Sequence, residues 1–386
     1  EGGMMSKAYQ IYSNLLFAKA GGQGIPLSGT FELTSRCNLD CRMCYIHKRI
    51  NDRTAIDREW STQQWINLAK ECQQAGTLLL LLTGGEPLVR PDFKEIYTAC
   101  RRMGMMVSVN SNATLIDNEM VNFFSDDPPS RINITLYGAS PETYGSLCGN
   151  PSAYERVVKA ILALKAAGVL VKLNFSVTPY NRQDAQKVYQ FAKEHELALQ
   201  AATYMFPPVR ACEQGCFSAD RMTAEEAASE QMAYDRFRFS EEELQQRLQD
   251  QLAGIRVEDP DKECQEQPTE RIRCRAGSST FWVTWDGCLR PCGMMTEPSA
   301  SLHEMRFANA WQTIRNARQQ IMVPPQCTSC KMSHACDQCA ALCYAETGAF
   351  TGVPTYMCQK THAYLELAHK HVLELKSGKI DKINEA

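Results

Sequence analysis

Three cysteines near the start of the chain have a spacing that could bind an iron–sulfur cluster. They lie in Cys37-Asn-Leu-Asp-Cys41-Arg-Met-Cys44, directly after a β-rich segment at residues 29–33. A loop of eight residues can bring three thiolates to three irons of a [4Fe–4S] cluster. The fourth iron then has no protein ligand, and an open metal position can bind a substrate or cofactor.

A second candidate motif follows a run of five leucines at residues 78–82 and reads Thr83-Gly84-Gly85-Glu86-Pro87. Glycines let the backbone approach a ligand closely, and a carboxylate can accept an ammonium group. Further polar residues follow later β-rich segments, at the edge where parallel sheets bind ligands. The candidates are Asn110, Asn112, Ser140 and Ser176, and each could equally be an ordinary loop-capping residue.

These motifs resemble those of the radical S-adenosylmethionine (SAM) superfamily, whose cluster loop reads C-x3-C-x-φ-C, usually with an aromatic residue at φ. Met43 is at φ in this chain, a departure at the position of the adenine contact. The resemblance implies that Gly84, Gly85 and Glu86 hold the amino group of SAM. It also implies that Asn110, Asn112, Ser140 and Ser176 contact its ribose and carboxylate.

The C-terminal part contains ten of the eighteen cysteines, between Cys264 and Cys358. The pattern is C-x12-G-x4-C, a gap, C-x2-C-x5-C-x2-C, a gap, and C. It resembles the SPASM extension of radical SAM enzymes, except that the fourth spacing is one residue short, so that either Cys339 or Cys343 is the ligand. The resemblance favours Cys339. Zinc is the rival ligand, but five residues between two C-x2-C pairs is short of the roughly 15–20 typical of a zinc ribbon.

Such extensions often bind two auxiliary [4Fe–4S] clusters, which together need eight thiolates. Seven come from the pattern, and Cys264 can supply the eighth. The interleaved connectivity of the family implies one set of Cys264, Cys274, Cys292 and Cys339 and a second set of Cys327, Cys330, Cys336 and Cys358. The expected cofactors are therefore SAM and three [4Fe–4S] clusters.

Seven cysteines then have no ligand role: Cys72, Cys100, Cys148, Cys212, Cys216, Cys288 and Cys343. Cys72 and Cys100 fall in helical segments and are best explained as small core residues. Cys212, Cys216, Cys288 and Cys343 are weak candidates for donating hydrogen to a substrate radical, with a structural role the preferred alternative.

The elements that must position these residues alternate between short β-rich runs and amphipathic helical stretches, which predicts repeated βα units and a parallel sheet. Capping boxes at Ser61-x-x-Gln64 and Ser152-x-x-Glu155 predict the starts of two helices. The expected fold is α/β, a partial (β/α)6 TIM-type barrel with a C-terminal cysteine-rich iron–sulfur (SPASM) domain. Six strands are expected at residues 29–33, 78–82, 105–109, 132–136, 169–177 and 198–204.

The expected division of the chain follows its composition. A leading segment that begins with a tag remnant is expected at residues 1–25, and the barrel at 26–204. A bridge follows at 205–262, with a helical stretch at 223–252. The cysteine-rich domain is expected at 263–365, and a C-terminal helix and tail at 366–386.

Composition and charge narrow the function classes. The chain has 386 residues, 44% hydrophobic, and a net charge of −3, which excludes a disordered protein and gives no electrostatic case for nucleic acid. No secretory signal or membrane span is recognisable, so we expect a cytoplasmic protein, where clustered thiols favour metal sites over disulfides.

The resemblance implies reductive cleavage of SAM to a 5′-deoxyadenosyl radical and hydrogen abstraction from a peptide, giving a crosslink, thioether, oxidation or epimerisation. It implies an external electron donor of the flavodoxin or ferredoxin type. Only about 25 residues precede the first strand, too few for a domain, so recognition of a leader peptide would use the existing surface or a separate leader-recognition protein. The alternatives are an anaerobic sulfatase maturase, disfavoured because Gly293 stands where those enzymes usually have an aspartate, radical modification of a small molecule or cofactor precursor, and a non-catalytic metal-stabilised binding protein.

Overall fold

A computed structural model describes residues 7–46, 48–207, 220–254, 272 and 274–376. Its centre is a nine-stranded sheet in the order β11-β10-β9-β1-β4-β5-β6-β7-β8. The six strands from β1 to β8 pair in parallel, which confirms the expected βα repeats. Their bounds are β1 Ser28–Glu32, β4 Leu79–Thr83, β5 Met106–Ser111, β6 Arg131–Thr135, β7 Val171–Ser176 and β8 Ala198–Ala202.

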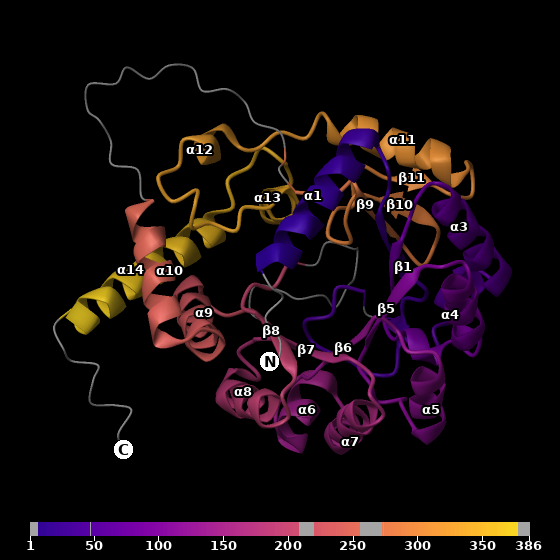
Figure 1. Cartoon of the computed structure of the whole chain (residues 1–386), viewed down its shortest axis with the longest axis horizontal. Coiled ribbons are helices and arrows are strands. Elements are labelled where there is room, and N and C mark those ends of the chain that lie inside the picture. The colour runs from indigo at the N-terminus through magenta and orange to yellow at the C-terminus, as the bar shows by residue number, and fades with distance from the viewer. Residues whose placement is uncertain (1–6, 47, 208–219, 255–271, 273, 377–386) are drawn as a thin grey trace.

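Helices cover the outer side of these strands, and Figure 1 shows them following one another around the sheet. The apolar residues of each strand alternate toward this layer, as in the contact between Phe31 of β1 and the Trp65 ring at 5.2 Å. The opposite, inner side of the sheet therefore carries the intervening residues. The covering helices are α3 Thr62–Gln74, α4 Phe93–Arg102, α5 Asn118–Asp126, α6 Pro141–Cys148, α7 Ala153–Ala166 and α8 Ala185–Glu194.

The two predicted capping boxes have different outcomes. At the start of α3 the Ser61 hydroxyl accepts from the Gln64 amide and the Gln64 side chain accepts from the Ser61 amide, so this box is confirmed. At the start of α7 the box is wrong, because Ser152 has helical backbone angles and makes no side-chain capping bond. An N-cap residue needs an extended backbone for its hydroxyl to reach the N3 amide.

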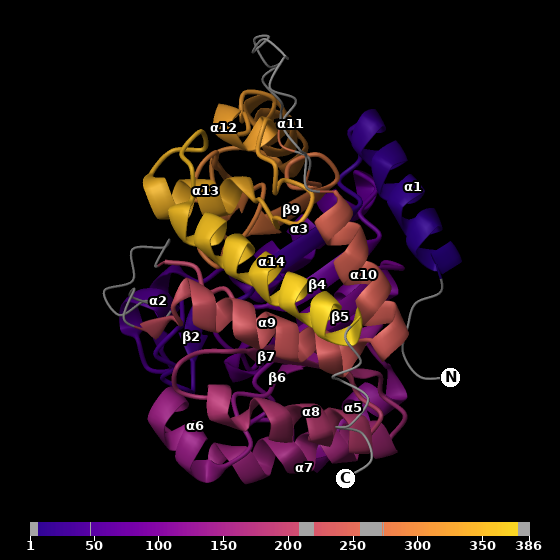
Figure 2. The same cartoon turned by 90° about the vertical axis from the view of Figure 1, so that its left-hand side faces the viewer.

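The polar stretch expected as one helix at 223–252 is two helices, α9 Ala224–Arg238 and α10 Glu241–Ala253. The chain is extended at Phe239, and Ser240 starts a second capping box. Both helices pack against α14, Thr355–Lys376, which runs beside α9 in Figure 2. Their shared apolar cluster contains Ala228, Met232, Leu244, Leu248, Tyr364, Ala368 and Val372.

The cysteine-rich part continues the same sheet. Strand β9, Thr280–Val283, pairs in parallel with β1, and β10 Cys288–Arg290 and β11 Ala300–Ser301 follow as antiparallel neighbours. Helices α11 Phe307–Arg318, α12 Pro325–Thr328 and α13 Ala340–Thr347 complete this part, and α1, Lys7–Gln23, precedes the barrel. The expected α/β fold, a partial barrel followed by a cysteine-rich region, is thereby confirmed. Among the described helices, none has the length and apolar character needed to cross a bilayer.

Candidate cofactor site at the carboxyl edge of the sheet

The cysteine loop leaves the carboxyl end of β1 and is fixed to the end of α6. The amide of Asp40 donates to the Cys148 carbonyl and the amide of Arg42 to the Leu147 carbonyl, both at 3.0 Å. These two bonds flank Cys41, whose side chain is buried, whereas Cys37 and Cys44 are half-buried. The loop therefore holds its middle thiol against the protein and leaves the outer two accessible.

Nitrogen donors surround the first thiol. The Leu39 amide lies 3.4 Å from Cys37 Sγ, and Asn112 Nδ2 lies 3.6 Å from it. Burial raises the pKa of the Cys37 thiol, and the nearby Glu86 carboxyl and the Cys41 and Cys44 thiols act in the same direction. A bound cluster offsets this effect, because its irons stabilise thiolates. Hydrogen bonds to cluster sulfurs also tune the reduction potential.

The glycines of Gly84-Gly85-Glu86 have a local structural reason. The Gly85 amide donates to the Thr34 carbonyl at 2.8 Å, and the Glu86 amide donates to the Arg36 carbonyl at 2.9 Å. A Cβ on Gly84 would lie 2.5 Å from the Thr34 oxygen, and one on Gly85 would lie 2.4 Å from the Arg36 oxygen. The glycines are thus needed for close packing of this loop on the cysteine loop.

The Glu86 carboxylate is fully buried and is bonded by three protein donors. It accepts from the Ser111 hydroxyl at 2.9 Å, the Asn112 amide at 2.7 Å and the Leu88 amide at 3.1 Å. It therefore ties the end of β4 to the end of β5. These bonds fix the loop, whose Gly85 and Glu86 amides bond to the segment that leads into the cysteine loop.

The other expected SAM contacts lie at the ends of their strands and have protein partners. Asn110 accepts from Asn133 Nδ2 at 2.7 Å on the inner side of the sheet. Ser140 caps α6, with its hydroxyl accepting from the Thr143 amide at 3.2 Å. Ser176 ends β7 with a half-buried side chain, and Met43 packs against the edge of the core.

Several residues near the thiols carried no recognisable sequence signal. Asn38 Nδ2 donates to the Thr114 hydroxyl at 2.7 Å, and Asn38 Oδ1 accepts from Asn112 Nδ2 at 3.0 Å. These bonds link the cysteine loop to the end of β5. Cys148 and Tyr137 contact Cys41 from the β6 side, and the Cys148 contact together with burial raises the pKa of Cys41. These partners are scattered over about a hundred residues, so only the fold brings them together.

One of the two expected auxiliary sets is gathered around a cavity of about 30 Å³. Its lining includes Cys327, Cys330, Cys336 and Cys358. Burial raises the pKa of Cys327 to about 11, and the neighbouring thiols of Cys358, Cys336 and Cys330 contribute in that order. These four thiols are therefore near neighbours at the start of α14.

Only part of the other set lies within the described residues. Burial raises the pKa of Cys339, and Cys274 is close enough to add to the shift. Cys292 packs in the same small apolar cluster as Cys339 and Phe206. Cys343 is fully buried between the sets, and burial, followed by the nearby thiols of Cys327, Cys339 and Cys336, raises its pKa. Cys264, Cys212 and Cys216 lie outside the described residues, and Cys288 is half-buried on β10.

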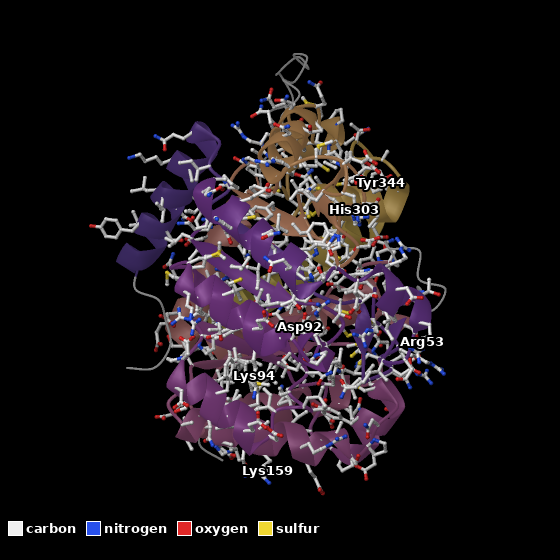
Figure 3. All side chains as sticks on the ribbon, turned by 90° about the vertical axis from the view of Figure 1, so that its right-hand side faces the viewer. Arg53, Asp92, Lys94, Lys159, His303 and Tyr344 are labelled. Atoms are coloured by element: carbon white, nitrogen blue, oxygen red, sulfur yellow. The ribbon has the colours of Figure 1, made fainter. Side chains whose placement is uncertain are left out.

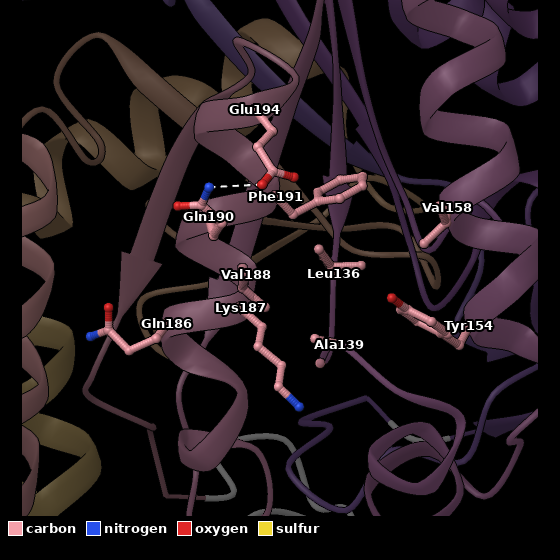
Figure 4. A pocket seen from close by; sticks show the side chains of 11 residues that line it. Leu136, Ala139, Tyr154, Val158, Gln186, Lys187, Val188, Gln190, Phe191 and Glu194 are labelled. Carbon is pink, nitrogen blue, oxygen red and sulfur yellow. Dashed lines mark hydrogen bonds between the residues drawn. The ribbon is translucent and has the colours of Figure 1, made fainter.

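Two further features lie apart from the thiols. A groove of about 560 Å³ on the outer side runs between α7 and α8, lined by Tyr154, Val158 and Phe191, and it includes none of the candidate residues (Figure 4). In the described ranges no three His, Cys, Asp or Glu side chains converge as for a single metal ion. A [4Fe–4S] cluster needs a wider set, since each thiolate binds a different iron.

The profile of the radical SAM superfamily matches residues 31–192, which hold the cysteine loop and the strand ends described above. Residues 31–192 belong to the radical SAM superfamily. Members of the superfamily use SAM and a [4Fe–4S] cluster, and the chain is a radical SAM enzyme. The three thiols at the open edge of this radical SAM domain, with amide donors beside Cys37, fit a cluster with one open iron.

Curated relatives of the radical SAM domain and its C-terminal part include two AdoMet-dependent heme synthases. The one from Methanosarcina barkeri is 26% identical over 83% of this chain and 93% of its own length. The one from Oleidesulfovibrio alaskensis is 24% identical over 83% of this chain and 84% of its own length. Among solved structures, Streptococcus suis SuiB bound to S-adenosylmethionine has a TM-score of 0.62 at 16% identity, covering 92% of this chain and 84% of SuiB. Native anSMEcpe with bound AdoMet has a TM-score of 0.64 at 17% identity, covering 92% of this chain and 100% of anSMEcpe. At these identities the structural likeness is one of fold.

Proposed function

We propose that the enzyme carries three [4Fe–4S] clusters and oxidises its substrate. The observation that carries the proposal is the gathering of Cys327, Cys330, Cys336 and Cys358 around one small cavity, apart from the SAM site. Cys264, Cys274, Cys292 and Cys339 would hold the third cluster. Fully ligated clusters have no open iron, so their task is electron transfer to or from the substrate, which favours oxidative outcomes.

The residues of the SAM site divide into ligands and positioning groups. Cys37, Cys41 and Cys44 would hold the cluster, and the loop at Gly84–Glu86 would hold the amino group of SAM. When bound, the cluster and SAM supply one-electron cleavage of the sulfonium and hydrogen abstraction from an unactivated carbon. Asn112 donates to Cys37 and keeps that thiol oriented, while Glu86 fixes the loop beside it.

The inner side of the sheet is the substrate region in this proposal. Glu32 and Trp282 point there, joined by the bond from Trp282 Nε1 to Glu32 Oε2 at 2.9 Å. A Cβ on Gly293 would lie 2.9 Å from the Trp282 ring, so this position has no room for the acidic side chain of a sulfatase maturase. Sulfatase maturation is therefore the weaker alternative.

Two substrate classes are supported. The heme synthases that match most of this chain support a cofactor precursor of the tetrapyrrole class. A ribosomally made peptide is supported by the cysteine pattern and the shared fold with SuiB, which is also known bound to a precursor peptide. In both cases a low-potential donor of the flavodoxin or ferredoxin type would reduce the SAM-site cluster, and a peptide could need a separate leader-recognition protein.

Iron content and product masses test the proposal. We expect about 12 irons per anaerobically reconstituted chain, from three cubanes. A Cys330→Ala and Cys358→Ala double variant should fall to about eight and still cleave SAM, because it lacks only one auxiliary cluster. An unmodified chain with about four irons would contradict the auxiliary part. Reduced enzyme is then given SAM with either Fe-coproporphyrin III, the compound in the name of a further relative, or a precursor peptide of the SuiA kind. The substrate that loses mass identifies the class.

A further inference from the structure

A buried group of charged side chains lies directly behind the cysteine loop. Arg36 donates two parallel hydrogen bonds to the Glu59 carboxylate, from Nε to Oε1 at 2.7 Å and from Nη2 to Oε2 at 3.0 Å. Arg90 Nη1 also donates to Oε2, at 3.3 Å. The side chains of Arg36, Glu59 and Arg90 are only 12%, 8% and 6% exposed, so this contact is shielded from water and salt.

Arg90 is itself held from three directions. Its guanidinium donates to the Leu33 carbonyl at 3.1 Å and to the Trp60 carbonyl at 3.0 Å. Asp92, labelled in Figure 3, accepts two further bonds from it, at 2.9 and 2.6 Å. Arg90 therefore joins the end of β1 to the start of α3, and it gives Glu59 a fixed anchor.

Glu59 in turn holds Arg36, the residue that precedes the first cysteine of the cofactor site. Arg36 directly precedes Cys37, and its carbonyl accepts the Glu86 amide at 2.9 Å. The Arg36 amide donates to the Thr34 hydroxyl at 3.0 Å, and that hydroxyl donates to Glu59. The Glu59 carboxylate therefore bonds to the Arg36 side chain directly and to the Arg36 backbone through the Thr34 hydroxyl.

We propose that Glu59 is a positioning residue of the SAM site, acting through Arg36. It sets the distance between the Cys37 thiol and the Gly84–Glu86 loop, without touching the cluster or SAM, and the inference rests on the cofactor site assigned above. A buried ion pair adds little net stability compared with apolar packing, whereas its bidentate geometry fixes orientation. Replacing Glu59 leaves the buried Arg36 guanidinium without its carboxylate, which lowers the free energy of unfolding. At the site, the expected consequence is a displaced Cys37 thiol, and iron content reports whether the variant folds and holds its clusters.

The test is Glu59→Gln in the reconstituted holoenzyme, with iron content, SAM affinity and the SAM-induced change in the electron paramagnetic resonance spectrum as readouts. We expect iron content to equal that of the unmodified enzyme, because all three thiols remain, and the Kd for SAM to rise about tenfold, the lower end of the effect that outer-shell substitutions have on metal sites. Glu71→Gln is the control, because the Glu71 carboxylate likewise anchors another segment, by accepting from the Phe307 amide at 2.8 Å, but it lies away from the loop. It should leave the Kd and the spectrum unchanged.

Arg36→Lys is a second variant, which keeps the positive charge but cannot make the two parallel bonds to Glu59. It should raise the Kd in the same direction, and the effect of adding Glu59→Gln to it should be much smaller than in the unmodified background. Unchanged SAM affinity and spectrum in Glu59→Gln would overturn the inference. An unmodified enzyme whose spectrum does not respond to SAM would instead overturn the cofactor site itself.

Discussion

Burial and hydrogen bonding act in opposite directions on Glu86. Burial is the larger effect and raises the pKa of Glu86 to about 7, although three donors favour its ionised form. An unfolded glutamate titrates near 4.5, so between these values the folded protein binds more protons than the unfolded one. This residue alone therefore lowers the free energy of unfolding as the pH rises from about 4.5 to about 7.

The size of this effect can be measured with Glu86→Gln. A shift of this size corresponds to about 3 kcal/mol, by 1.36 kcal/mol per pKa unit. We expect anaerobic urea unfolding of the unmodified enzyme to lose stability between pH 5 and pH 7 relative to the variant, even though the variant starts lower because its amide cannot accept all three bonds. Parallel pH profiles for the two proteins would contradict the assignment.

At this scale the sequence predicts what is regular and misses what is not. The spacing of Cys37, Cys41 and Cys44 predicts a cluster loop at a strand end, because all three lie within eight residues of the chain. The contact between Arg36 and Glu59 spans 23 residues with no repeating pattern, so it becomes visible only in three dimensions. The assignment of Cys339 rather than Cys343 stays a prediction, favoured because Cys274 lies close enough to Cys339 to add to the rise of its pKa.

Helix starts allow a direct test at the scale of elements. Ser61 and Ser152 precede similar sequence patterns, but only Ser61 makes the reciprocal capping bonds. Ser61→Ala should lower the free energy of unfolding by about 1 kcal/mol, whereas Ser152→Ala should change it by a few tenths at most. Urea unfolding of the two variants beside the unmodified protein decides this, and equal losses would mean that the capping bonds are not what stabilises α3.

The same pair explains where prediction of the elements ends. Strand positions were predicted to within a few residues, since buried β-branched and leucine runs lie between turn residues. The division into α9 and α10 was missed because the break at Phe239 contains neither glycine nor proline. Tertiary packing on α14 stabilises the two short polar helices there, including the bond from the Tyr364 hydroxyl to Asp235 at 2.8 Å.

The whole molecule is joined by one sheet. Composition predicts a boundary near residue 263, and beyond it β9 lies beside β1 in register from Ser28 with Thr280 to Phe31 with Val283. Phe281 packs against Gly29, where a Cβ would be 2.3 Å from its ring. The barrel and the cysteine-rich part therefore share buried surface, and the SAM-site loop begins on the strand that joins them.

Shared burial predicts that both parts unfold together. Phe281 in β9 is 2% exposed and contacts the Phe307 ring at 4.9 Å, and Phe175 in β7, within the barrel, is 1% exposed. Replacing either by alanine should cost about 3–5 kcal/mol. In a cooperative molecule, Phe281→Ala and Phe175→Ala each shift one common urea transition, followed by tryptophan fluorescence and by cluster absorbance. Two independent domains would give two transitions, each moved by only one of the variants, because neither part would then depend on the packing of the other.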